Sequence, residues 1–166
     1  MKYGNTLFSM RIKDVQSDIT QRALQTPDSD QYISNMQAVK AWSVSTEIEL
    51  IHPLIEGVNK AIEDLPLSAD EESLAFLDTA IHNQLLIDNS PFNKAQLNVF
   101  SQWISAAEQL ETAARELKKG LILLALFRHI PQKELAETLE KPAPTLAKWS
   151  KQAEANFTPP PAPNFD

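Results

Sequence analysis

Apolar residues recur at intervals of three and four along almost the whole of this 166-residue chain. That spacing places them on one face of an α-helix, whereas a half-buried strand needs alternation of apolar and polar residues. The chain has only three glycines, and no alternating run of β-branched residues interrupts the pattern. The sequence therefore predicts an all-α fold, a bundle of amphipathic helices.

Prolines and capping residues divide the pattern into helices. Pro53 has no backbone N–H and clashes with the preceding turn, so we expect one helix to stop or kink before it and the next to start at it. Ser68 followed by Glu71 forms a capping box, which opens a further helix. The helices predicted in the first half of the chain are residues 7–26, 28–52, 53–65 and 68–87.

A heptad pattern runs from Phe100 to Leu124, where apolar positions follow alternating steps of three and four residues. It passes through Gly120, which costs about 1 kcal/mol inside a helix but does not forbid one. We expect residues 91–129 to form one long helix, or two helices broken near Gly120. The heptad is either a dimer seam or the central helix of an intramolecular bundle.

Charge is distributed unevenly along the chain, whose net charge is −7. Residues 1–112 hold 7 of the 15 basic and 16 of the 22 acidic residues, whereas residues 113–156 hold 8 basic and 5 acidic ones. We therefore predict an acidic helical bundle at 1–112, a basic unit at 113–157 that the helix 91–129 enters, and a proline-rich tail at 158–166. A basic module in an acidic chain favours a polyanion as its partner.

Cysteine is absent, which excludes disulfides and agrees with a reducing compartment. The longest apolar run, residues 121–127, is far shorter than the roughly 20 residues that cross a bilayer. The N-terminal residues form no apolar signal segment. We expect a cytoplasmic protein with no membrane partner.

Two short helices and a tight turn are predicted near the end of the chain. The first covers residues 132–139, residues 140–143 make the break, and the second begins at or near Pro144. Helices that cross steeply need a small residue at the crossing, and Ala136 supplies it. The apolar residues predicted to fill the wedge between the helices are Leu135, Leu139, Leu146 and Trp149.

Residues 132–151 resemble the helix-turn-helix of phage-repressor (Cro and repressor-like) regulators. The pattern of that family opens with Gln, has Ala at its fifth position, apolar residues at its fourth, eighth and fifteenth, and often Trp at its eighteenth. Gln132 and the five residues named above match it in order. With the preceding helix, the resemblance implies a tri-helical DNA-binding unit.

The turn departs from the family pattern. Repressor-like regulators have glycine at the ninth position, which lets the turn adopt a left-handed conformation, and a hydrophobic residue at the tenth. Here these are Glu140 and Lys141, followed by Pro142. We therefore expect the turn to take another path, or the first helix to run longer.

The resemblance implies that DNA is contacted by the second helix and its surroundings. The residues predicted to bind it are Lys133, Lys141, Thr145, Lys148 and Lys151. Reading of base edges normally uses Arg, Asn or Gln, whereas lysines are suited to phosphates. We predict a dimeric DNA-binding regulatory protein that holds DNA mainly by its backbone. The alternative is a helical adaptor whose unit binds protein instead, with the acidic bundle or the tail as a further contact.

Catalytic and metal-binding signals are weak. Glu49 and His52 form an E-x-x-H pair as in di-iron bundles, but such sites need a second pair, and Asp78 and His82 have the wrong spacing. No nucleophile motif and no phosphate-binding glycine loop is present. We expect no enzyme, cofactor or metal, and a structural or solvated role for the histidines.

Overall fold

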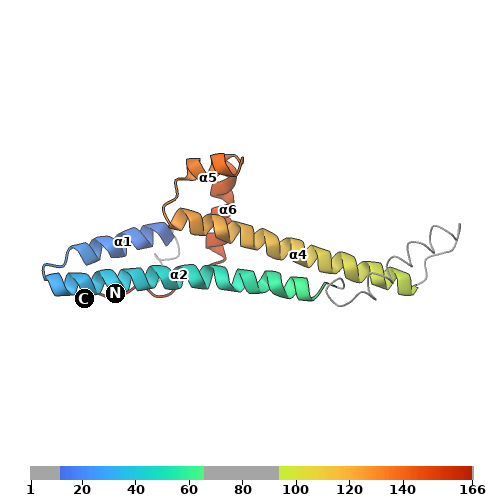
Figure 1. The fold of residues 1–166 in the computed structure, drawn as a ribbon, viewed down its shortest axis with the longest axis horizontal. Helices are drawn as coiled ribbons and strands as arrows, with labels where there is room; N and C mark the ends of the chain where they lie inside the picture. Colours follow the sequence, from blue (N-terminus) through green and yellow to red (C-terminus); the bar gives the residue numbers. More distant parts are fainter. Residues whose placement is uncertain (1–11, 66–93, 166) are drawn as a thin grey trace. The chain divides into compact units, whose positions relative to one another are not determined.

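A computed structural model describes residues 12–65 and 94–165, with side chains from 100 onward in the second range. These residues form α-helices and no strand (Figure 1), which confirms the all-α prediction for the described part of the chain. The helices are α1 (Ile12–Leu24), α2 (Ser29–Glu63), α4 (Lys94–Phe127), α5 (Gln132–Thr138) and α6 (Ala143–Ala155). The helix predicted at 68–87 lies outside the described residues. None of the helices in these ranges combines the length and apolar character needed to cross a bilayer.

The chain divides into two compact units. Unit 1 combines residues 1–53 with residues 118–166, and unit 2 is residues 54–117. The sequence had placed residues 1–53 in an acidic bundle that ends at 112, whereas the structure groups them with the C-terminal helices. In unit 2, the buried apolar residues of the described part are Ala61 on α2 and Ala106 on α4.

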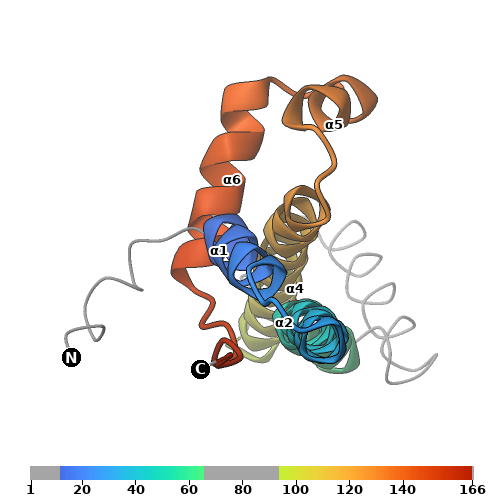
Figure 2. The same cartoon turned by 90° about the vertical axis from the view of Figure 1, so that its left-hand side faces the viewer.

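The core of unit 1 is assembled from both ends of the chain. The buried face of α1 carries Ile12, Val15, Ile19 and Ala23, at the three- and four-residue spacing of an amphipathic helix. Figure 2 shows α1 beside α2, α4 and α6. The core is completed by Val39, Trp42 and Leu50 from α2, Leu123 and Phe127 from α4, and Ala153 from α6.

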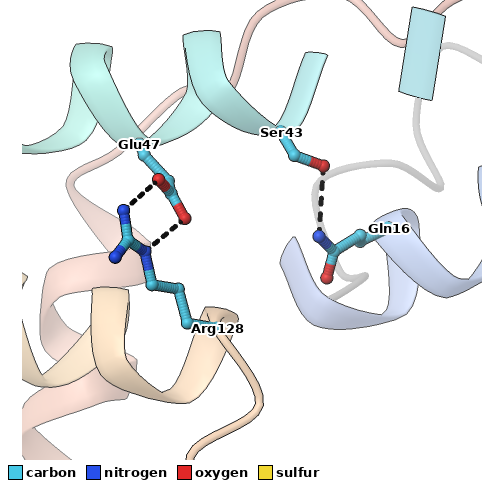
Figure 3. Close-up of polar contacts among 4 residues, drawn as sticks. All are labelled: Gln16, Ser43, Glu47 and Arg128. Carbon is cyan, nitrogen blue, oxygen red and sulfur yellow. Dashed lines mark hydrogen bonds and ion pairs between the residues drawn. The ribbon is translucent and has the colours of Figure 1, made fainter. Parts of the chain in front are cut away.

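Two polar links tie α1 and α2 to the C-terminal helices. The backbone N–H of Ile12, the first residue of α1, donates to Glu154 Oε1 on α6 at 2.6 Å. Such an N–H has no partner within its own helix, and a carboxylate there also interacts favourably with the helix dipole. Arg128 donates twice to the carboxylate of Glu47, at 2.8 Å each (Figure 3). This pairing raises the pKa of the Arg128 guanidinium, first through the hydrogen bond and then through the charge of Glu47.

The predicted break at Pro53 was wrong, because α2 continues through it as one helix. An interior proline removes one backbone hydrogen bond and crowds the preceding turn, at a cost of about 3 kcal/mol. Leu50 before it and Ala61 after it are both buried, whereas Pro53 itself is exposed. Packing on either side of the proline therefore holds the helix together at a residue that disfavours it.

Helix α4 passes through Gly120 without a break, so one helix is present and not two. It ends in a left-handed turn, in which His129 has φ 62°. The N–H of His129 donates to the carbonyl of Leu126, and that of Ile130 to the carbonyl of Ala125. This pair of bonds is the Schellman motif that commonly closes a helix. The heptad positions described on α4 are exposed or half-buried, and the dimer seam stays a prediction.

Candidate nucleic-acid interface

Helices α5 and α6 are joined by a four-residue turn whose conformation differs from our expectation. Glu140 has φ 52°, the left-handed region that usually requires glycine. Its N–H donates to the carbonyl of Glu137 at 3.2 Å, and the N–H of Lys141 to the carbonyl of Ala136 at 3.0 Å. These bonds close α5 in a second Schellman motif. The turn thus follows the left-handed path despite the missing glycine, and α5 does not run longer.

A small apolar core holds α4, α5 and α6 together. Leu146 is completely buried, and Ala136 and Ile122 are nearly so. Leu135 and Trp149 pack against these residues while remaining half-buried. Ala136 therefore provides the small side chain that close approach of the helices requires.

Leu139 does not belong to this core, and its predicted burial was wrong. It is 43% exposed. The expectation rested on continuing the helical period one turn beyond Leu135. Leu139 is instead the C-cap of α5, where the chain leaves the helix for the left-handed turn, and its side chain meets solvent.

Two side-chain contacts brace this three-helix arrangement. The Gln132 amide at the start of α5 donates to the carbonyl of Ala143 at the start of α6, at 2.7 Å. The ammonium of Lys118 on α4 lies 4.0 Å from the centroid of the Trp149 ring. Sequence reasoning missed the role of Lys118, because no local motif connects a lysine on α4 with a tryptophan on α6. A cation over an aromatic ring contributes about 0.5–1 kcal/mol at exposed sites.

Lys148 and Lys151 stand three residues apart on α6, on the side opposite the buried Leu146 and Ser150. Both are exposed, as is Lys141 in the turn. Within the described ranges, none of these three lysines takes part in an ion pair. Their charges are therefore free to meet an anion.

The remaining predicted DNA-binding residues are less favourably placed. The ammonium of Lys133 lies 3.9 Å from Glu137 on the same exposed face of α5, and Glu134 adds a second carboxylate to that helix. Thr145 is half-buried in the first turn of α6, where its N–H donates to the carbonyl of Pro142. The structure thus concentrates unpaired positive charge on α6 and the turn, and not on α5.

Lys13 of α1 lies near Lys151, and Glu154 lies near both. Lys13 and Lys151 line one pocket, whose walls include Leu123, Leu126 and Phe127 of α4. The pocket encloses about 80 Å³, far below the roughly 300 Å³ of the smallest typical ligand sites. It has no room for a cofactor, but it places a lysine from the N-terminal helix beside the predicted interface. Nothing in the local sequence around Lys13 signals this.

The metal site that Glu49 and His52 could suggest is not completed within the described ranges. There, no group of three or more histidine, aspartate or glutamate side chains comes together as metal ligands would. Asp78 and His82, the other two residues considered as metal ligands beside Glu49 and His52, lie outside the described residues.

Comparison of the chain with models of known protein families, with curated proteins and with solved structures finds no match.

Proposed function

We propose that the chain is a cytoplasmic, dimeric DNA-binding regulatory protein in which residues 132–151 act as a helix-turn-helix unit. The observation that carries the proposal is the left-handed conformation of Glu140. This residue stands at the ninth position of the repressor-like pattern, where that family has glycine. The burial of Ala136 and Leu146, at the fifth and fifteenth positions, adds support.

The proposed mode of binding is contact with the phosphate backbone. The outer face of α6 carries Lys148 and Lys151 and no Arg, and the one amide beside them, that of Gln152, is half-buried. Lysines pair with phosphates, which position a protein on DNA without specifying a base sequence. In this proposal Lys141 and Lys13 add further positive charge, which Glu140 beside Lys141 and Glu154 beside Lys13 and Lys151 partly oppose.

The salt dependence of DNA binding tests this mode. Each lysine that neutralises a phosphate contributes about 0.9 to the slope of log affinity against log salt. We expect Lys148→Ala with Lys151→Ala to reduce the slope by about 2 on a duplex of arbitrary sequence, with unchanged helicity. Lys40→Ala on α2 removes the same charge from an exposed site elsewhere in unit 1, and should leave the slope unchanged. Absence of binding to any duplex at low salt would exclude the proposal.

One observation favours the adaptor function as a second candidate. Ile55 and Ile62 stand seven residues apart in the part of α2 that belongs to unit 2, and each is 44% exposed. Large apolar residues exposed in a row are typical of surfaces that bind protein. Light scattering of purified protein, with Ile55→Glu as the variant, measures whether this face self-associates. A monomeric mass would remove the dimer from our proposal and leave DNA binding to be judged by the salt test.

A further inference from the structure

The proline-rich tail occupies a defined place on unit 1. Residues 157–165 contain no helix, as the prolines predict, yet Phe157 and Phe165 both pack against the core. The indole N–H of Trp42 donates to the carbonyl of Pro160 at 2.9 Å. A buried indole N–H needs such an acceptor, and Trp42 is only 5% exposed.

Two of every three positions in the tail keep a constant burial. Phe157, Pro160 and Pro163 are half-buried and residues 158, 161 and 164 are exposed, whereas in the third set Pro159 and Phe165 are half-buried and Ala162 is exposed. A period of three is that of a polyproline II helix, which makes no internal hydrogen bonds and leaves its carbonyls available. Proline also fixes φ in advance, so little conformational entropy is lost when such a segment docks.

The receiving surface is rigid and aromatic. The ring of Phe127 meets that of Trp42 edge-on, with centroids 6.2 Å apart and planes at 63°. The Thr46 hydroxyl donates to the carbonyl of Trp42 at 2.7 Å one turn along α2. An aromatic surface with an indole N–H directed at a carbonyl is the usual arrangement by which proteins bind polyproline II segments.

We propose that Trp42 and the apolar residues around it form a binding site for proline-rich peptides of partner proteins that also carry an aromatic residue. In this state residues 158–165 fill the site as a tethered ligand. A short tether gives its ligand an effective concentration in the millimolar range. A partner peptide therefore binds in competition with the tail, and binds more readily when the tail is weakened.

A peptide of residues 158–166 serves as the probe, added to the full-length chain. Phe165→Ala weakens the chain's own tail, so this variant should bind the peptide at least about fivefold more tightly than the wild type does. Pro161→Ala alters an exposed position of the tail and should behave as the wild type. Adding Trp42→Phe to the weakened chain removes the N–H donor but keeps an aromatic ring, and should reduce affinity about three- to tenfold. Trp103→Phe on α4, in unit 2, is the matched control and should have no effect on peptide affinity.

Two results would overturn the proposal. One is a folded Phe165→Ala chain that takes up no peptide at about 5 mM, well into the range of the tether. The other is an affinity for the peptide that stays the same when Trp42→Phe is added to the Phe165→Ala chain. If Phe165→Ala fails to fold, excess peptide is added to wild-type chain, and the amide resonances of Ala162 and Phe165 should move towards those of the free tail. Concentration-dependent dimers that depend on Phe165 would identify the occupant as the tail of a second copy, and would overturn the assignment to a partner peptide.

Discussion

Replacing Glu140 with glycine is expected to stabilise unit 1. Glu140 is held at φ 52° by the two hydrogen bonds that close α5. Its side chain is exposed and makes no hydrogen bond or ion pair with the residues at 12–65 and 94–165 that the substitution would remove. The conformational cost of its Cβ is therefore the main quantity that the change to glycine relieves.

The size of the effect follows from two opposing terms. A left-handed conformation costs an L-residue roughly 1–2 kcal/mol. Glycine itself lowers the free energy of unfolding by roughly 0.5–1 kcal/mol, because it has more conformational entropy to lose when the chain folds. The expected gain is the difference, about 0.5–1 kcal/mol in the free energy of unfolding. For a chain of this size, that corresponds to a rise in melting temperature of roughly 1–4 °C.

Urea denaturation of Glu140→Gly and Glu140→Ala separates the effect of the backbone conformation on stability from the effect of the glutamate charge. Alanine removes the carboxylate but keeps the Cβ, so it should leave the midpoint nearly unchanged while glycine raises it at constant slope. Both variants remove a negative charge beside Lys141, and both should increase DNA affinity equally. Equal stability of the alanine and glycine variants would refute the conformational argument.

Three further substitutions test other parts of the structure. Gly57→Ala should raise the free energy of unfolding by up to about 1 kcal/mol and so shift the urea midpoint upward, since the helix favours alanine and no described atom lies within 4 Å of the added Cβ; a lower midpoint would contradict this. Pro53→Ala should stabilise α2 by about 2 kcal/mol, measured as helicity and melting temperature, and a loss of either would mean that the proline is needed. Lys118→Met should lower the free energy of unfolding by about 0.5–1 kcal/mol and change the fluorescence emission of Trp149. Lys148→Met should change neither, because Lys148 lies over no aromatic ring of the described residues.

Much of the helical architecture could be predicted from sequence because it depends on local periodicity. The apolar stripe of α1 and the pair α5 and α6 follow from residues three and four apart, whereas the same spacing left open whether α4 continues through Gly120. The end of a helix predicted at Pro53 was wrong, because the free-energy cost of a proline inside a helix is outweighed by the packing of residues before and after it. A pattern of single residues carries no measure of that packing.

The details of the candidate interface were harder to predict. The left-handed Glu140 is imposed by the packing of α5 on α6, and glutamate gives no sign of it. Lys13 lies beside Lys151 although the two are far apart in the sequence, and charge counting along the sequence cannot detect this. The docking of the tail could not be predicted from the sequence either, because Trp42, which binds Pro160, lies more than a hundred residues earlier.

The discontinuous make-up of unit 1 has a consequence for its biosynthesis. A ribosome adds roughly 5–20 residues per second, so α1 and the start of α2 emerge several seconds before the helices that complete their core. Until Phe127 and Ala153 are made, the apolar face of α1 has no C-terminal partner to pack on. The core of unit 1 is therefore complete only after its C-terminal helices have been made. Its first helix must wait for the last one, whose Glu154 binds the N–H of Ile12.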